Sequence, residues 1–155
     1  MRNRTLWILV LVLCALPSFA KSFTPKKNTR ADIKAYVQHA AKVVAKSGPS
    51  CKTFEGKEWR AGDYYVFVIG PDDKTLCHPK ASLIGKPTNE IVDEKGRHVG
   101  NEIAAAGKKK GGGWVEYMWP RLGTDKAIPK STYATHVKGP DGKTYVVGSG
   151  GYEVK

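Results

Sequence analysis

Residues 111–133 read GGGWVEYMWPRLGTDKAIPKSTY, and the rest of the chain is organised around this stretch. Three glycines release the backbone before a short aromatic strand that carries Trp114, Tyr117 and Trp119. A proline-rich connection follows, and Lys130 opens the next strand. Aromatic rings beside a lone cation, placed on strands, predict a small pocket.

A helix is predicted upstream of this stretch. Ile33, Val37, Ala40 and Val44 recur at spacings of four, three and four, which is typical of one helical face. Thr29 is suited to cap the first turn, and a Ser-Gly-Pro sequence ends the pattern.

Runs of β-branched and aromatic residues predict the strands of a sheet. The first pair spans 64–69 and 75–78, and the later strands span 114–119, 131–138 and 144–149. Two Gly-Pro-Asp-x-Lys turns predict tight hairpins, and short helical patterns fill the interval between the second and third strands. This order predicts an α+β domain, an antiparallel sheet with helices on one side.

The N-terminus predicts a signal peptide over residues 1–20. Arg2 and Arg4 precede an apolar run at 6–16, and a small-x-small pattern predicts cleavage after Ala20. The apolar run is shorter than the ~20 residues of a bilayer span. We therefore expect a periplasmic or secreted protein.

The formal net charge is +12, and loss of Arg2 and Arg4 with the signal peptide leaves +10. Such charge would point to nucleic acid in a cytosolic protein, but an exported protein rarely meets any, so no nucleic-acid partner is expected. The lysines are scattered, which favours a solvated surface. The same positive field also attracts anionic ligands, anionic membranes or acidic partners.

Cys51 and Cys77 are the cysteines that remain after cleavage. An even pair in an oxidising compartment favours a disulfide, which would stabilise the fold by about 3.5 kcal/mol. The alternatives are free thiols or, more weakly, metal ligands, because no metal-ligand spacing accompanies them. Catalytic signatures such as Gly-x-Ser-x-Gly are missing from the sequence, so we expect neither an enzyme nor a cofactor.

An ordered series of short motifs carries a family resemblance. The motifs are YYVFV at 64–68, LCHP at 76–79, GK at 85–86, DxxG at 93–96, GWVxYxWP at 113–120, PKxxY at 129–133 and VGSGxY at 147–152. Because these motifs occur in this order, residues 29–155 resemble a single Cache domain of the second type. This is the PAS-like extracellular sensor module of bacterial chemoreceptors and kinases. Residues 21–28 are then an exposed N-terminal segment.

The resemblance implies a long N-terminal helix across an antiparallel sheet of about five strands, with a ligand cavity on one face. It implies small metabolites as ligands, often short-chain carboxylates. Family members usually sit between membrane helices, whereas this chain is predicted to be exported and free. We therefore expect a membrane-bound signalling protein as its partner.

Candidate ligand-binding residues follow from placing the family's cavity on this sequence. Lys130 would pair with a ligand carboxylate, the tyrosines and His78 would donate hydrogen bonds, and Trp119 would form an apolar wall. Ordinary sheet packing, a structural histidine and a solvated lysine are the competing interpretations. The complete set is Tyr65, His78, Tyr117, Trp119, Lys130 and Tyr133.

The favoured hypothesis is an exported Cache domain that binds a small, anionic metabolite for sensing or presentation to a partner. A structural or adhesive periplasmic protein with a basic surface and no small-molecule ligand is the alternative. A thiol-based redox role for the two cysteines is weaker than both.

Overall fold

The computed structural model describes residues 22–155, so the predicted signal peptide lies outside the described residues. The strands form one antiparallel sheet with the order β2-β1-β5-β4-β3. In chain order the elements are α1 (Arg30–Ser47), η1 (Cys51–Phe54), β1 (Phe67–Ile69), β2 (Thr75–Cys77), η2 (Ala81–Leu83), η3 (Thr88–Glu90), α2 (Val99–Lys108), β3 (Gly113–Pro120), β4 (Ala127–Lys138) and β5 (Thr144–Tyr152).

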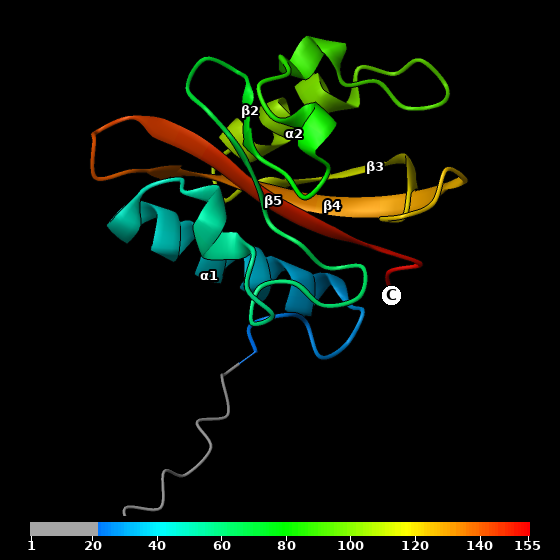
Figure 1. Ribbon diagram of the computed structural model, residues 1–155, viewed down its shortest axis with the longest axis horizontal. Helices are drawn as coiled ribbons and strands as arrows, with labels where there is room; N and C mark the ends of the chain where they lie inside the picture. Colours follow the sequence, from blue (N-terminus) through cyan, green and yellow to red (C-terminus); the bar gives the residue numbers. More distant parts are fainter. Residues whose placement is uncertain (1–21) are drawn as a thin grey trace, which may run out of the picture.

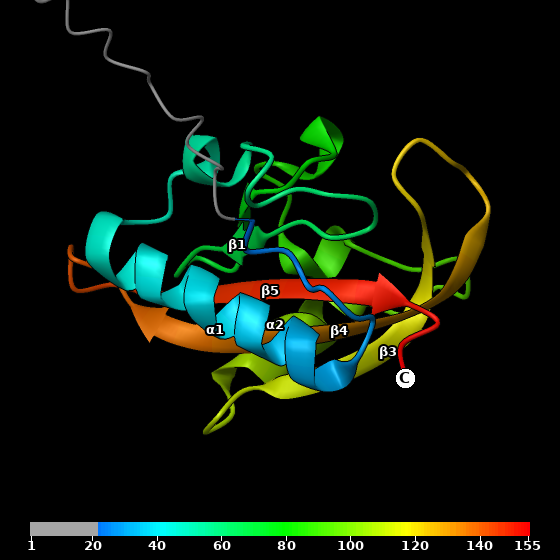
Figure 2. The ribbon, with the colours of Figure 1, turned by 90° about the horizontal axis from the view of Figure 1, so that it is seen from below.

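The α1 helix follows its sequence signals closely. The Thr29 side chain accepts a hydrogen bond from the Asp32 amide at 3.2 Å, and Gly48 ends the helix with a φ of 82°. The apolar stripe that includes Ile33 and Val44 is buried against β4 and β5. Figure 2 shows α1 lying across these two strands.

The helices cover opposite faces of the sheet, with α1 on one side and α2 on the other (Figure 1). The expectation that all helices share one side is therefore wrong. Tight turns fix which strands are antiparallel neighbours, but they do not fix the face that a helix between β2 and β3 covers.

The repeated turn sequence forms two hairpins as predicted. In the β1–β2 hairpin the Gly70 amide donates to the Lys74 carbonyl at 2.7 Å, and in the β4–β5 hairpin the Gly139 amide donates to the Lys143 carbonyl at 2.8 Å. The α+β fold class, with a long helix across a five-stranded antiparallel sheet, is confirmed.

Two strand starts differ by several residues from the sequence prediction. β1 begins at Phe67, because Tyr64 pairs instead with Ala61 in an isolated bridge. β4 begins earlier than predicted and contains Pro129. β5 pairs with β4 only from Lys130 onward, so at Pro129 β4 has a neighbouring strand on one side only. Proline has no amide hydrogen to donate, and such an edge position tolerates it.

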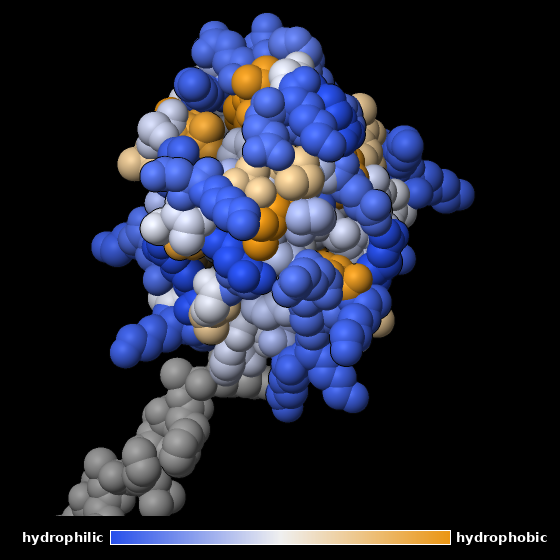
Figure 3. Space-filling model, turned by 90° about the vertical axis from the view of Figure 1, so that its right-hand side faces the viewer, coloured by the Kyte–Doolittle hydropathy of each residue, from blue (hydrophilic) through white to orange (hydrophobic). Residues whose placement is uncertain are grey.

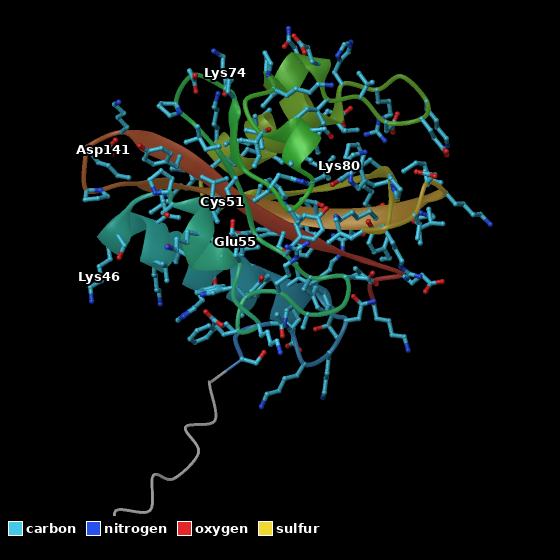
Figure 4. The ribbon with its side chains drawn as sticks, viewed as in Figure 1. Lys46, Cys51, Glu55, Lys74, Lys80 and Asp141 are labelled. Carbon is cyan, nitrogen blue, oxygen red and sulfur yellow. A yellow bond between two sulfur atoms is a disulfide. The ribbon has the colours of Figure 1, made fainter. Side chains whose placement is uncertain are left out.

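Cys51 and Cys77 are joined in a disulfide, as the sequence predicts, with their Cα atoms 4.9 Å apart. The bridge connects η1, which follows α1, to β2 at the edge of the sheet (Figure 4). It thereby fixes the start of the long connection that leads to β1.

The segment before α1 is only partly exposed, although we expected residues 21–28 to be exposed. The Phe23 ring stacks on His39 with centroids 4.4 Å apart and lies 4.8 Å from the ring of Trp59. The Asn28 side chain donates to the Tyr152 carbonyl at 2.5 Å. Within residues 22–155, no helix is both long and apolar enough to cross a membrane.

Candidate functional site

A buried lysine lies on the α2-facing side of the sheet, beside the end of β5. Lys130 on β4 is the register partner of Tyr117 on β3 and of Tyr152 on β5, so the three residues form a row across the sheet. The side chain of Lys130 is 2% exposed, and its ammonium donates to the Tyr65 hydroxyl at 2.6 Å. The same ammonium lies 4.3 Å from the Tyr65 ring centroid and 5.1 Å from that of Tyr152.

Lys130 has no carboxylate partner within 4.0 Å among the residues that the structure describes. Burial lowers the pKa of Lys130, because desolvation disfavours the charged form. The two aromatic rings offset part of this cost through cation–π attraction. An anion that reached this position would find a cation already desolvated and held in place.

A cavity of about 40 Å³ lies beside this cluster, between the sheet and α2. At about 10–15 Å³ per water position, it has room for about three water molecules. Its walls are mostly apolar, and the lining residues are Tyr65, Phe67, Ile69, Thr75, His78, Leu83, Ile91, Val99, Gly100, Ile103, Tyr117 and Trp119.

Tyr65 and Tyr117 bring hydroxyl groups to the cavity. The Tyr117 and Thr132 hydroxyls are hydrogen-bonded at 3.0 Å. Burial raises the pKa of Tyr65 and of Tyr117, so both hydroxyls keep their protons. Because the Tyr65 oxygen accepts from Lys130, its own O–H is available to donate to a ligand.

His78 is a neutral donor at the cavity wall. Its Nδ1 accepts a hydrogen bond from the Lys80 amide at 2.9 Å, which places the ring proton on Nε2. Burial, followed by the nearby charge of Lys130, lowers the pKa of His78 to about 3. The imidazole packs edge-on against Tyr65 with centroids 5.1 Å apart, which fixes its orientation.

Trp119 is the apolar wall that the sequence predicts. Its ring packs edge-on against Tyr117 with centroids 5.7 Å apart. It lines both the inner cavity and a larger outer groove.

The structure gathers Tyr65, His78, Tyr117, Trp119 and Lys130, and it separates Tyr133 from them. Tyr133 packs in the core beneath α1, on the other face of the sheet, and its hydroxyl donates to the Gly111 carbonyl. Its assignment to the cavity was wrong because it lies three residues from Lys130 on one strand, and an odd spacing places two side chains on opposite faces.

Sequence reasoning missed several parts of the cavity. Tyr152 completes the aromatic surroundings of Lys130, and only the β4–β5 register shows this. Val99 and Ile103 lie on α2, within the interval where the sequence predicts short helices, but their face of the sheet was not evident from the sequence. Gly100 allows α2 to approach η3 closely, since a Cβ there would lie 2.3 Å from the Thr88 carbonyl oxygen.

A metal centre finds no support in the described part of the chain. No group of three or more histidine, cysteine, aspartate or glutamate side chains within residues 22–155 is arranged to hold a metal ion. The donors around the cavity are instead hydroxyl, imidazole and ammonium groups, which suit an anionic organic ligand.

Comparison with known proteins points to one family. Residues 26–155 match the Cache domain family model dCache_2. Methyl-accepting chemotaxis protein McpP of Pseudomonas putida is 31% identical over 90 residues, which span 57% of this chain and 16% of that protein.

Solved structures agree with the family match. One described as "Structural basis for carboxylic acid recognition by a Cache chemosensory domain" is 28% identical, with a TM-score of 0.54 over 77% of this chain and 73% of that chain. A "periplasmic sensor domain of chemotaxis protein" is 30% identical, with a TM-score of 0.51 over 58% of this chain and 61% of that chain. A methyl-accepting chemotaxis protein from Vibrio parahaemolyticus shares the fold at 24% identity, with a TM-score of 0.52 over 79% of this chain and 74% of that chain.

Proposed function

The chain belongs to the Cache domain family, and on this premise we propose that it binds a small carboxylate in the cavity beside Lys130. The observation that carries the proposal is a buried ammonium with aromatic neighbours and no carboxylate partner within the described residues. A protein that keeps such a charge without a counter-ion loses stability by doing so. A ligand carboxylate would supply the missing counter-ion.

The other cavity groups complement a carboxylate. Tyr65 lines the cavity, and because its hydroxyl oxygen accepts from Lys130, its O–H can donate to a ligand. The Nε2–H of His78 offers a second neutral donor. Two donors and a cation behind them match the two oxygens of a carboxylate.

The size and polarity of the cavity favour a short ligand. Room for about three water molecules favours a short-chain acid over a long one. The apolar side chains of Phe67, Val99 and Ile103 would contact its hydrocarbon part. A ligand with a charged amino group would need a carboxylate partner here, and the residues that line the cavity provide none.

A related structure supports the carboxylate class. Carboxylic acid recognition is the subject of the Cache chemosensory domain that is 28% identical to this chain, with a TM-score of 0.54. We extend that class to this protein because its buried lysine, tyrosines and histidine form a compatible site.

A structural neighbour that is 30% identical to this chain is described as a periplasmic sensor domain of a chemotaxis protein. We propose that this chain is exported and that its liganded form acts on a membrane-bound signalling partner. A partner would have to distinguish the loaded from the empty state, so ligand binding must change the stability or the shape of a surface that the partner contacts.

Thermal unfolding with a ligand panel tests the proposal. Acetate, propionate, lactate and pyruvate are compared with amino acids and amines at constant pH and ionic strength. A binding acid at 100 times its Kd should stabilise the protein by about 2.7 kcal/mol. A panel in which no carboxylate raises the Tm would contradict the proposed function.

A further inference from the structure

A second, larger hollow adjoins the proposed carboxylate cavity. It is an outer groove of about 500 Å³, and it shares His78 and Trp119 with the inner cavity. Its remaining walls come from three separate connections, which are the segment before β1, the segment after β2 and the β3–β4 connection. The lining residues are Arg60, His78, Pro79, Lys80, Trp119, Pro120, Arg121, Leu122, Gly123, Thr124 and Asp125.

Three cations converge on this outer groove. Arg121 is committed to ion pairs with Asp63 at 3.2 Å and with Glu153 at 3.8 Å. Arg60 and Lys80 form no ion pair with any other residue that the structure describes. Asp125 contributes the one carboxylate among the lining residues, so the groove keeps a positive excess.

The free cations line a hollow that shares two residues with the inner cavity. His78 and Trp119 line both hollows, whereas Arg60 and Lys80 line only the outer one. The charges of Lys80 and Arg60 also contribute to the lowered pKa of His78, after burial and Lys130. Cations beside two adjoining hollows suit a ligand with an anionic group at each end.

The surface around the groove does not resemble a protein-docking surface. The end of the molecule that carries the β3–β4 connection is mostly hydrophilic, with small hydrophobic patches separated by polar side chains (Figure 3). A small, charged ligand fits such a surface better than an apolar protein partner does.

We propose that the outer groove is a second anion subsite and that the protein prefers linear dicarboxylates, with one carboxylate at Lys130 and the other at Arg60 and Lys80. This inference rests on the proposed carboxylate function and narrows its ligand class. A monocarboxylate fills the inner cavity alone, whereas a dicarboxylate also neutralises the groove.

Succinate and butyrate form a matched pair of probes, because they share a carbon skeleton and differ by one carboxylate. Titration calorimetry at constant ionic strength should show succinate binding the unmodified protein about five- to tenfold more tightly than butyrate, the effect of a charge-assisted contact at an exposed position. In an Arg60→Ala/Lys80→Ala variant this ratio should fall below about twofold while the butyrate affinity stays unchanged.

Lys46→Ala is the matched control, since Lys46 is an exposed cation in the last turn of α1, at the opposite side of the view from Lys80 (Figure 4). The control should keep the succinate preference. Equal or weaker binding of succinate in the unmodified protein overturns the proposal, and so does a preference that survives in the double variant. A double variant that weakens binding of both acids equally, with the ratio intact, also overturns it, because the groove would then only attract anions.

These outcomes are separable from failure of the proposed function. If Lys130→Met leaves butyrate affinity unchanged, or if neither acid binds, the carboxylate site itself is refuted and the groove proposal falls with it. If Lys130→Met abolishes butyrate binding while the groove variant leaves the succinate preference intact, only the groove proposal is refuted.

Discussion

Replacing Lys130 with Met removes the buried ammonium and keeps an unbranched apolar side chain of similar length. In the ligand-free protein the charged lysine is desolvated and has no carboxylate partner within the described residues. The substitution therefore removes a contribution that lowers the free energy of unfolding. Exchange of buried charge for apolar volume stabilises proteins by about 1–4 kcal/mol. Loss of the hydrogen bond to the Tyr65 hydroxyl offsets about 1 kcal/mol of that gain.

We therefore expect Lys130→Met to be more stable than the unmodified protein by about 0–3 kcal/mol, with a central value of about 1.5 kcal/mol. Such a change raises the Tm by roughly 3–8 °C for a domain of this size. The same variant should lose the thermal stabilisation that a carboxylate gives. A rise in stability together with a loss of ligand response is the signature of a binding residue rather than of a packing residue.

The pH dependence of this difference has a definite sign. Burial lowers the pKa of Lys130 in the folded state from the 10.5 of an unperturbed lysine. Below the lowered pKa the cost of the buried charge is fully present, and it disappears as the pH rises through the interval up to 10.5. The stability gap between variant and unmodified protein should therefore narrow as the pH rises from neutral toward 10.5.

Urea unfolding at several pH values measures this gap. Lys130→Ala serves as a control for volume, because it removes the charge but leaves a cavity and should gain less stability or lose some. A Lys130→Met variant that is less stable than the unmodified protein, or whose stability gap does not change with pH, would refute the reasoning.

Three further outcomes follow from the contacts around the cavity. His78→Ala should weaken carboxylate binding. In the unmodified protein the affinity should not change with the ionisation of His78 between pH 5 and 8, because the pKa of His78 is about 3. An inflection of the affinity near pH 6.5 that disappears in His78→Ala would argue against a neutral donor. Tyr133→Phe should leave ligand affinity unchanged and lower the free energy of unfolding by about 1 kcal/mol. Tyr117→Phe should reduce ligand affinity. A calorimetric titration of both variants tests these assignments to opposite faces of the sheet. Removing the disulfide by Cys51→Ala/Cys77→Ala should lower the free energy of unfolding by about 3.5 kcal/mol, and two alkylatable thiols in the native protein would show that the bridge is not formed.

The overall architecture was predictable where local chemistry decides it. The apolar stripe from Ile33 to Val44, with its Thr29 cap, specifies α1 without reference to the rest of the chain. The two Gly-Pro-Asp turns specify both hairpins, since their backbone requirements are met within each turn. Tyr65 lines the cavity, whereas the partly buried Tyr64 packs against the core on the α1 face, as alternation along an extended segment predicts.

The remaining features depend on contacts between distant segments. Tyr133 was misplaced although alternation along one strand would have separated it from Lys130, so a stricter use of the two-residue period would have corrected it. The row of Tyr117, Lys130 and Tyr152 needs the register of three strands, which turn chemistry alone does not give. The meeting of Arg60 and Lys80 at one groove depends on how irregular segments pack, and no local pattern in the sequence encodes it.

The central claim is that the buried Lys130 ammonium is the counter-ion of a bound carboxylate. Isothermal titration of the acid that raises the Tm most, into the unmodified protein and into Lys130→Met at the same pH and ionic strength, tests this claim most directly. The account predicts saturable binding to the unmodified protein and an affinity about 100-fold weaker in the variant, the value of a lost charge-assisted contact in a buried site. Equal affinities for the two proteins would contradict it.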